Sequence, residues 1–226
     1  VMTEGEWQST TLGSPQGGVI SPLLANLYLH YLDTIWNKQF AHLGTLVRYA
    51  DDLVVLCHRK EEARKTIQIV KSVLQKLELS MNNEKSKLVN LWEDREGFDF
   101  LGHHHRRWAY WARRGKVLYY LRSYPSRKAL KKMRSRIREE FTSNHRLGWS
   151  LEDWIRKLNP IIQGWKNYYA NIDPTAANRF LAKVGWYIRV KLIRWWNRKH
   201  KKRKTSGFDF FLLLRNAGLK TLSNWD

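Results

Sequence analysis

The chain has 226 residues, a formal net charge of +21 at pH 7, and 12 Trp, 10 Tyr and 8 Phe. This aromatic content excludes a disordered polycation, and the length allows one large domain or two small ones with buried cores. Residues 17–32 carry no charge but are too few and too rich in Pro, Asn and Tyr to span a bilayer, so we expect no membrane partner.

The charge is unevenly distributed along the chain. Residues 1–100 carry 11 Lys and Arg against 13 Asp and Glu, a net charge of −2, whereas residues 101–226 carry 30 against 7, a net charge of +23. A near-neutral half joined to a basic, aromatic-rich half favours chemistry beside a module that binds a polyanion, and nucleic acid fits best. The single cysteine, Cys57, excludes an internal disulfide and favours a reducing cytoplasm, bacterial or organellar.

A glycine-rich loop followed by a helix is the first structured segment that the sequence predicts. Ser21 and Pro22 mark a helix start with Ser21 as N-cap, and helical spacing predicts one buried face that holds Leu23, Leu24, Leu27, Tyr31 and Ile35. Glycines within residues 13–18 would let the backbone approach a ligand closely, and exposed N–H groups near a helix start favour phosphate. An ordinary glycine-rich helix entry is the alternative.

Two adjacent carboxylates, Asp51 and Asp52, lie between short apolar runs at residues 46–49 and 53–57. The runs have strand length and β-branched content, and Asp is a turn residue, so the pair is predicted at the tip of a hairpin. Two carboxylates there repel each other unless a cation lies between them, and hard oxygen ligands suit Mg²⁺. A solvated Asp-Asp turn is the alternative if the motif stands alone.

The segments after the hairpin complete a mixed fold. Residues 60–79 are predicted as an amphipathic helix whose apolar side holds Ala63, Ile67, Val70, Leu74 and Leu77. A polar turn at residues 79–89 is expected to lead into a strand, and residues 98–102 have strand character. This order of elements predicts an α+β fold, with helices packed on an antiparallel sheet.

Four motifs in this order resemble the palm of a reverse transcriptase, and the group II intron class most of all. They are Gly-Ser-Pro-Gln-Gly-Gly at 13–18 with the Ser-Pro-Leu-Leu-Ala-Asn that follows, Tyr-Ala-Asp-Asp at 49–52, Asn-Asn-Glu-Lys-Ser-Lys at 82–87, and Phe-Asp-Phe-Leu-Gly at 98–102. The resemblance covers the near-neutral half of the chain.

The resemblance implies a role for each matching position. Asp51 and Asp52 would hold the Mg²⁺ ions, or Mn²⁺ in their place, of a two-metal nucleotidyl transfer to a primer 3′-hydroxyl. The residues implied in binding the template–primer or the incoming deoxynucleotide triphosphate are Tyr49, Pro15, Gln16, Gly17, Gly18, Lys85 and Gly102. Lys85 would lie near the triphosphate, with an ordinary surface lysine as the alternative.

One departure from the family pattern concerns the metal site. The family takes a further metal-binding carboxylate from an earlier motif on a strand, whereas Glu4 and Glu6 lie in a polar stretch without apolar strand residues. Motifs of the fingers are absent as well. We therefore expect the C-terminal part of a longer enzyme, which is incomplete as a polymerase when alone.

Aromatic residues and cations alternate after the palm motifs. His103, His104 and His105 would point to alternate faces of a strand, which disfavours a shared metal ion and favours structural or RNA-adjacent roles. Three aromatic residues lie among arginines and could stack on bases, with ordinary sheet packing as the alternative use: Trp108, Tyr110 and Trp111.

A turn at residues 124–126 marks the predicted domain boundary. Three helices are expected after it. The first runs over 126–141 with Ser126 as its cap, and the second opens with a capping box at residues 150–153 and is kinked or ended by Pro160. The third runs from the N-cap Asp173 to about His200. Their outer faces carry an excess of one charge sign, where a solvated face would mix signs, and this favours RNA binding. The cations expected to contact RNA are Arg127, Lys128, Lys131, Lys132, Arg198, Lys199, Lys201, Lys202, Arg203 and Lys204.

Residues 158–169, Leu-Asn-Pro-Ile-Ile-Gln-Gly-Trp-Lys-Asn-Tyr-Tyr, resemble the maturase-specific or X domain of group II intron proteins. The resemblance implies a polymerase thumb that also helps to bind intron RNA. Its aromatic side chains are expected to pack the bundle core rather than face RNA, and they are Trp165, Tyr168 and Tyr169. Two domains follow from these matches, a partial reverse-transcriptase palm at 1–125 and an all-α thumb/X domain at 126–226.

The predicted function is that of a group II intron RNA-directed DNA polymerase and splicing maturase, which acts on intron RNA and an RNA/DNA template–primer. A homodimer or a complementing N-terminal chain is expected as a further partner. The alternative is a non-polymerising RNA-binding maturase protein or a domesticated remnant. The missing carboxylate favours this alternative, and the retention of Asp51 and Asp52 opposes it.

Overall fold

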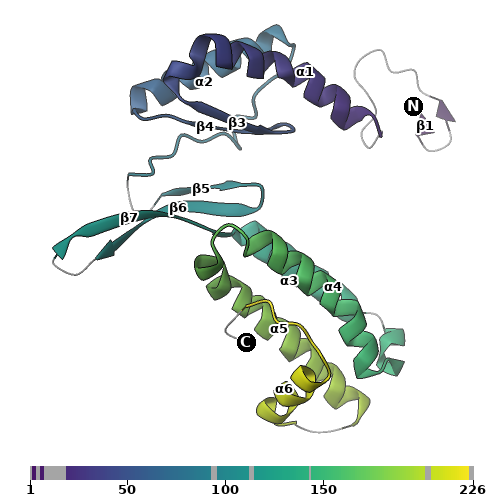
Figure 1. Ribbon diagram of the computed structural model, residues 1–226. Coiled ribbons are helices and arrows are strands. Elements are labelled where there is room, and N and C mark those ends of the chain that lie inside the picture. Colours follow the sequence, from purple (N-terminus) through teal and green to yellow (C-terminus); the bar gives the residue numbers. More distant parts are fainter. Residues whose placement is uncertain are drawn as a thin grey trace. The chain divides into compact units, whose positions relative to one another are not determined.

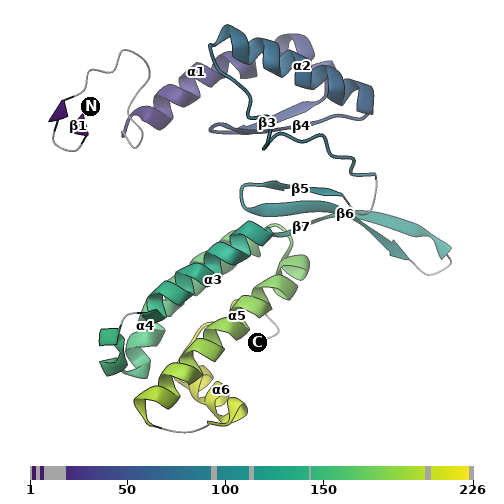
Figure 2. The ribbon, with the colours of Figure 1, turned by 180° about the vertical axis from the view of Figure 1, so that it is seen from behind.

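The computed structural model describes residues 2–3, 6–7, 19–92, 96–111, 115–142, 144–201 and 205–223. The chain forms two compact units, residues 1–90 and 91–226 (Figure 1, and Figure 2 from behind). Several predicted site residues lie outside the described residues, and they are Pro15, Gln16, Gly17, Gly18, Lys202, Arg203 and Lys204. The roles assigned to these positions stay predictions.

Two helices cover one face of the hairpin in the first unit. The first helix, α1 (Ser21–Ile35), continues into a π-helical turn at Trp36–Phe40 and a 3-10 turn at Ala41–Leu43. The second, α2 (Lys60–Lys76), runs beside α1 on the same side of the hairpin (Figure 1). The first unit therefore has helices on one side and a sheet surface on the other.

The strands of the first unit are short and antiparallel. The hairpin consists of β3 (Thr45–Tyr49) and β4 (Asp52–Leu56), paired along their full lengths. Another pair, β1 (Met2–Thr3) and β2 (Glu6–Trp7), precedes α1 in the chain.

The buried face of α1 differs from the predicted one. Leu23 and Leu27 are 66% and 70% exposed, and Leu24 and Tyr31 are exposed as well. The core of the unit instead holds Leu29, Leu32, Trp36, Leu43, Val70, Val73 and Leu74. The prediction is wrong because the core of this unit packs against the later part of α1, at Leu29 and Leu32, and does not cover Leu23, Leu24 and Leu27. The N-cap assignment of Ser21 is also wrong, since Ile20 occupies that position and Ser21 is the first helical residue.

The predicted helix over residues 60–79 is confirmed, but it ends earlier, at Lys76. Glu78 adopts a left-handed backbone (φ 55°), and the Leu79 amide donates to the Leu74 carbonyl at 2.9 Å, which closes the helix C-terminus. The polar turn expected in residues 79–89 does not lead directly into a strand, because the described residues 77–92 form no strand. Asn82 Oδ1 accepts hydrogen bonds from the amides of Glu84 and Lys85, and this side-chain turn replaces strand pairing.

A three-stranded antiparallel sheet opens the second unit. Its strands are β5 (Gly97–Phe100), β6 (His103–Trp111) and β7 (Val117–Pro125), in that order. Because β5 pairs only with residues 103–106, the remainder of β6 and β7 continues as a two-stranded ribbon, residues 107–111 with 117–121.

Among the described residues, four α-helices and a 3-10 turn at Asn144–Gly148 follow the sheet. The three predicted helices are confirmed as α3 (Arg127–Thr142), α4 (Leu151–Tyr169) and α5 (Pro174–Lys199). The fourth, α6 (Gly207–Asn216), has no counterpart among the sequence predictions. Pro160 lies inside α4 and does not end it. Among the described residues, none of these helices is long and apolar enough to cross a membrane.

Side-chain caps fix where the helices of the second unit begin. Ser126 Oγ accepts from the Ala129 amide at 3.1 Å, and Asp173 Oδ1 accepts from the Ala176 amide at 3.0 Å. Ser150 and Asp153 form the predicted capping box, in which each side chain accepts from the other residue's amide. Each of these caps stabilises its helix by about 1 kcal/mol.

One hydrophobic core joins the helices of this unit. Its fully buried members include Ile137, Trp154, Leu158, Leu181 and Leu214. The predicted core role of Trp165 and Tyr169 is confirmed, since both pack against this cluster. Tyr168 differs, because it is half exposed and its hydroxyl donates to the Leu101 carbonyl at 2.8 Å.

The sheet and the helices pack as one unit. Tyr124 on β7 stacks on Phe180 of α5, with ring centroids 4.2 Å apart, and Arg122 pairs with the α5 cap Asp173 at 3.1 Å. The compact units therefore divide between Asn90 and Leu91. The predicted domain boundary between residues 125 and 126 does not coincide with this division into compact units, and it stays a prediction. The predicted class, an antiparallel sheet with packed helices followed by a helical bundle, is confirmed.

Candidate active site and nucleic-acid interface

The two carboxylates lie at the tip of the β3–β4 hairpin, as predicted. Tyr49 pairs with Asp52, so Ala50 and Asp51 form a two-residue loop. Asp51, Asp52 and Tyr49 are all exposed. Ala50 adopts a left-handed backbone with φ 53°, a conformation that alanine rarely takes. The tip therefore presents two neighbouring carboxylates to solvent from a turn with an uncommon backbone.

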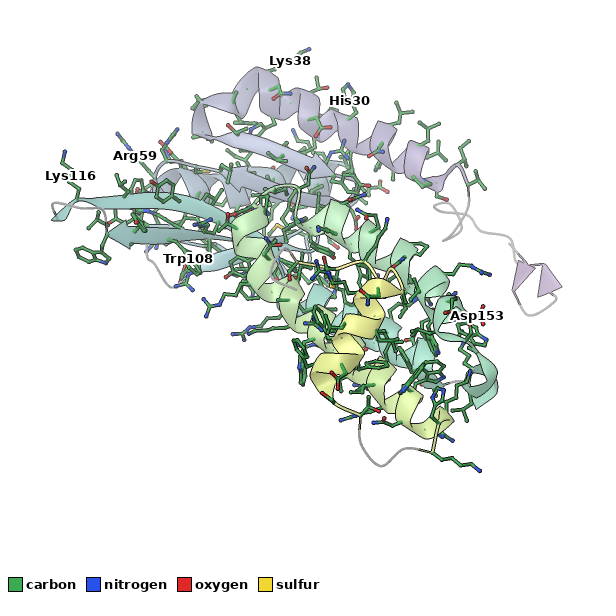
Figure 3. The ribbon with its side chains drawn as sticks, turned by 60° about the horizontal axis from the view of Figure 1, so that its bottom comes forward. His30, Lys38, Arg59, Trp108, Lys116 and Asp153 are labelled. Carbon is green, nitrogen blue, oxygen red and sulfur yellow. The ribbon has the colours of Figure 1, made fainter. Side chains whose placement is uncertain are left out.

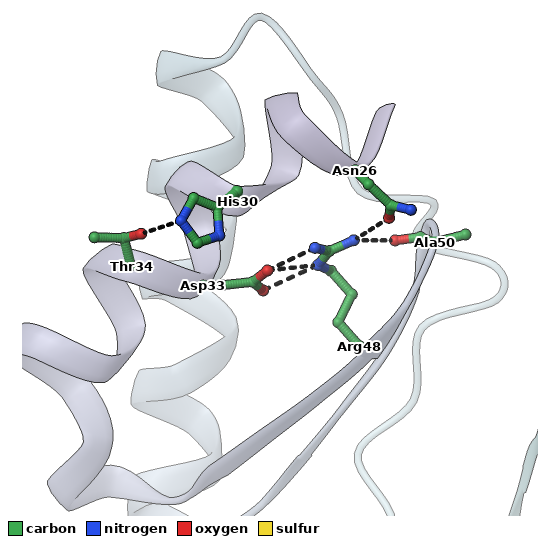
Figure 4. A network of polar contacts seen from close by, with 6 residues as sticks. All are labelled: Asn26, His30, Asp33, Thr34, Arg48 and Ala50. Atoms are coloured by element: carbon green, nitrogen blue, oxygen red, sulfur yellow. Dashed lines mark hydrogen bonds and ion pairs between the residues drawn. The ribbon is translucent and has the colours of Figure 1, made fainter. Parts of the chain in front are cut away.

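Arg48, on β3, connects this tip to α1 through hydrogen bonds. Arg48 Nε donates to Asp33 Oδ1 at 2.9 Å, and Arg48 Nη1 donates to Asn26 Oδ1 at 3.1 Å and to the Ala50 carbonyl at 2.8 Å (Figure 4). The arginine side chain is only 12% exposed. Its hydrogen bonds to Asp33 raise the pKa of Arg48 above its ordinary value, so the guanidinium stays charged at every working pH.

The chemistry of Asp51 and Asp52 fits a hard divalent cation. Within the described part of the chain, neither carboxylate forms an ion pair with a Lys or Arg side chain. Mg²⁺ needs few protein carboxylates, because water and phosphate oxygens complete its shell. The described residues hold no group of three or more His, Cys, Asp or Glu side chains suited to a metal ion, so the pair supplies a partial ligand set.

The other predicted palm residues occupy different places. Lys85 is exposed in the turn that Asn82 closes in the first unit. Gly102 lies in the second unit, in the two-residue turn between β5 and β6, with φ 77° beside Leu101 at φ 48°. A side chain at Gly102 would be strained in this backbone and would meet the Tyr169 hydroxyl at 3.1 Å. A packing reason therefore explains this glycine, and its contact with a primer stays a prediction.

The three consecutive histidines alternate across β6, as predicted. His103 is buried and lies against the rings of Tyr168 and Tyr169, each 5.1 Å away. On the opposite face, His104 Nδ1 lies 2.6 Å from Asp99 Oδ1. His105 Nδ1 lies 2.9 Å from Ser123 Oγ. These contacts support structural roles for the three side chains.

Acidification is expected to lower the stability of the second unit through His105. Partial burial, with smaller contributions from His103 and His104, lowers the pKa of His105 below 6.5 and outweighs the opposing effect of Asp99. The folded state then binds fewer protons than the unfolded state, so stability is complete above pH 6.5 and falls as the pH drops through the folded-state pKa. The unfolding temperature should fall by a few degrees between pH 7.5 and 5.5. The variant His105→Gln should lose much of this dependence, and an unchanged pH slope would exclude the assignment.

The ribbon of β6 and β7 exposes aromatic side chains. Trp108 faces Tyr120 across the ribbon, Tyr110 faces Leu118, and these four residues are 37–61% exposed. On the other face, the Arg107 guanidinium lies 3.5 Å from the Tyr119 ring centroid. Lys116 projects from the end of the ribbon (Figure 3). Exposed rings with cations nearby suit stacking on nucleic-acid bases.

The cations predicted to bind RNA differ in their availability. Those on α3, and two near the end of α5, are exposed: Arg127, Lys128, Lys131, Lys132, Arg198 and Lys201. The Lys199 ammonium instead donates to the carbonyls of Gly148 and Trp149 and lies over the Trp195 ring, so it holds the α3–α4 connection. Its predicted RNA contact has no support from this environment.

Two polar networks were not predicted from the sequence. The first is Arg48 with Asp33 and Asn26, whose signal is an arginine directly before the Tyr-Ala-Asp-Asp motif. The second surrounds Glu140 on α3, which is buried and paired with three cations from α3, the connection after it and α4: Arg136, Arg146 and Lys157. Its charged residues have the spacing of an ordinary solvated helix face, so the sequence gives no signal of burial.

A solvent-open pair of carboxylates on a hairpin and a basic helical unit with exposed aromatic rings together define a class. This class comprises nucleic-acid-processing proteins with a polymerase-type palm. Residues 2–105 match the family described as "Reverse transcriptase (RNA-dependent DNA polymerase)", and residues 130–208 match the "Group II intron, maturase-specific domain". The chain belongs to the family of group II intron reverse transcriptase/maturase proteins.

Two curated relatives share part of this sequence. One is the "Uncharacterized 91 kDa protein in cob intron" of Schizosaccharomyces pombe, 28% identical over 90 residues, which are 38% of this chain and 11% of that protein. The other is "Protein YkfC" of Escherichia coli, 29% identical over 131 residues, which are 44% of this chain and 34% of that protein. The chain thus matches about a third or less of the length of either relative.

Proposed function

We propose that this chain contributes part of the active site of an RNA-directed DNA polymerase and an RNA-binding domain of a group II intron maturase. The observation that carries the proposal is the placement of Asp51 and Asp52 on a hairpin tip, within a family of reverse transcriptases. Both are exposed, and neither carboxylate forms an ion pair with a Lys or Arg in the described part of the chain. Deoxynucleotide triphosphates and an RNA/DNA template–primer are the proposed substrates.

Asp51 and Asp52 are the proposed ligands of Mg²⁺, or of Mn²⁺ in its place. When bound, such ions supply Lewis-acid activation of a primer hydroxyl and charge stabilisation at the phosphate. Tyr49 lies beside the pair and would contact the primer end or the nucleotide, and Lys85 would lie near the triphosphate. A complementing N-terminal chain is proposed to supply the third carboxylate. A homodimer is a further proposed partner.

The maturase role is proposed to be binding rather than chemistry. The exposed cations of α3 and the aromatic ribbon support it, because cations neutralise phosphates and rings stack on unpaired bases. A group II intron RNA is the proposed ligand, since residues 130–208 match the maturase-specific domain. The half-buried free thiol of Cys57 suits the proposed location, a reducing bacterial or organellar cytoplasm.

Primer extension on an RNA template with Mg²⁺, with and without EDTA, tests the polymerase proposal. Extension by the chain alone would mean that its own residues complete the active site. Extension that requires a second polypeptide would support the proposed complementation. If the chain binds RNA but gives no extension, either alone or with a second polypeptide, a non-polymerising maturase is favoured and the polymerase proposal is overturned.

Neutralising four cations on α3 is expected to weaken RNA binding and flatten its salt dependence. The variant replaces Arg127, Lys128, Lys131 and Lys132 with glutamine. The slope of log K against log[salt] is negative, and each lost phosphate contact reduces its magnitude by about 0.7–0.9. The loss of four contacts should therefore reduce the magnitude by about 3. Affinity measured between 50 and 300 mM KCl, by fluorescence anisotropy, gives this slope.

The matched control neutralises four exposed cations on and before α2, in the near-neutral half of the chain: Arg59, Lys60, Arg64 and Lys65. Both variants lose the same charge, so a general electrostatic effect would change their slopes equally. A slope that falls only in the α3 variant would support a contact surface there. Equal slopes in the two variants would exclude it.

A further inference from the structure

The Arg48 side chain connects two motifs that are separate in the sequence. Asn26 belongs to the Ser-Pro-Leu-Leu-Ala-Asn run on α1, and Ala50 belongs to the Tyr-Ala-Asp-Asp hairpin. Arg48 Nη1 donates to both, at 3.1 Å to the Asn26 side chain and at 2.8 Å to the Ala50 carbonyl (Figure 4). The helix and the carboxylate loop are therefore joined through a single guanidinium nitrogen.

The hydrogen bond to Ala50 acts on the loop residue with the least favourable backbone. Left-handed backbone is unfavourable for a non-glycine residue and persists where the surroundings determine it. Ala50 at φ 53° directly precedes Asp51, and Asp52 follows as the first residue of β4. The direction in which both carboxylates leave the backbone thus depends on the conformation that Arg48 stabilises.

The opposite side of the guanidinium is anchored to the core. Arg48 Nε and Nη2 both bond to the Asp33 carboxylate, a two-pronged contact that fixes the plane of the guanidinium. Asp33 lies directly after Leu32 on α1, and Leu32 is fully buried. The loop is therefore held against a rigid element rather than against solvent.

The pairing with Asp33 also determines what Arg48 does not do. An unpaired arginine so close to Asp51 and Asp52 would compete with a divalent cation for their oxygens. Asp33 neutralises the guanidinium, so Arg48 can hold the loop backbone and leave both carboxylates available. This arrangement differs from an ordinary ion pair, because the arginine supports the site without occupying it.

We propose that Arg48 is a positioning residue, which holds the Ala50–Asp51 loop through the Ala50 carbonyl and so orients Asp51 and Asp52 to receive a divalent cation. Asp33 and Asn26 are its anchors on α1. The part of the inference that concerns cation binding rests on the proposed function. The part that concerns the loop conformation stands on the hydrogen bonds alone.

The test compares the full chain with Arg48→Gln, Arg48→Lys and the double variant Asp33→Asn/Arg48→Gln, using ¹⁵N-alanine and ¹⁵N-aspartate labels. The HN–Hα coupling of Ala50 reports its backbone conformation, and Mn²⁺-induced broadening of Asp51 and Asp52 amides reports cation binding. We expect the Ala50 coupling to change in all three variants and Mn²⁺ affinity at the tip to fall about tenfold, equivalent to 1.4 kcal/mol. The control is Arg64→Gln, an exposed arginine of α2, which should change neither.

The outcomes separate this inference from the proposed function. A wild-type chain that shows no Mn²⁺ broadening would refute the cation site, while the Ala50 coupling would still decide whether Arg48 positions the loop. Unchanged coupling and unchanged Mn²⁺ affinity in a folded Arg48 variant would overturn the inference. If Arg48→Gln unfolds because Asp33 loses its partner, the double variant removes both charges. Its Ala50 coupling and Mn²⁺ affinity then test the inference in place of Arg48→Gln.

Discussion

Replacing Asp51 and Asp52 together with asparagine is expected to abolish Mg²⁺-dependent primer extension while leaving the fold and RNA affinity unchanged. Both side chains are exposed, and the loop backbone is held by Arg48 rather than by either carboxylate. Asparagine keeps the size and turn preference of aspartate, so the hairpin should form as before. What is lost is the negative charge that a divalent cation needs.

The expected loss of extension rate is at least about 10³-fold, because metal ions stabilise transition-state charge by several kcal/mol. Extension should be measured under whichever condition supports it, with the chain alone or with a complementing polypeptide. A matched control is Glu61→Gln, which removes an exposed carboxylate from α2 in the same unit. Wild-type extension by the Asp51/Asp52 variant would place the chemistry at other residues.

The carboxylate hairpin could be predicted because its signals are local. Two apolar runs of strand length, separated by turn residues, specify a hairpin without reference to the rest of the chain. The caps at Ser126, Ser150 and Asp173 are local in the same sense, and all three are confirmed. Where a structure depends only on neighbouring residues, the sequence was sufficient.

The buried face of α1 could not be predicted in this way. Its first turns carry Leu23, Leu24 and Leu27 at helical spacing, yet these side chains are exposed in the first unit. Periodicity identifies an apolar stripe, but burial requires an apolar partner surface, and the core of the first unit packs only against the later part of α1, at Leu29 and Leu32. The partner of Arg48 is similarly distant, since Asp33 precedes it by 15 residues on another element.

Glu140 represents the strongest departure from the pattern of its helix. It is 4% exposed on α3, a helix whose other charged residues are mostly exposed. Its oxygens contact Arg136 at 3.1 Å and Lys157 at 3.9 Å, and Arg146 bonds both its carboxylate and its backbone carbonyl. Three elements therefore meet at one carboxylate: α3, the connection after it, and α4.

Truncating this carboxylate in Glu140→Ala is expected to destabilise the second unit by about 3–5 kcal/mol, the usual cost of removing one partner from a buried ion pair. The lower end is the better expectation, because Arg136 and Lys157 are 55% and 41% exposed and regain water. Arg146 is 18% exposed and would be left without a counterion in the core beside Trp154. Urea unfolding of the full chain, followed by tryptophan fluorescence, measures the change.

The neighbouring residue gives a matched control for this prediction. Glu139 is 67% exposed and lies 4.0 Å from Arg136, so Glu139→Ala removes the same charge from the same helix at the surface. A surface pair of this kind contributes at most about 0.5 kcal/mol. If the two alanine variants lose similar stability, the burial of Glu140 has no energetic consequence. Arg136, Arg146 and Lys157 would then act as solvated charges. If Glu140→Ala loses about 2 kcal/mol more free energy of unfolding than Glu139→Ala, Glu140 is instead the group that fixes α4 against α3.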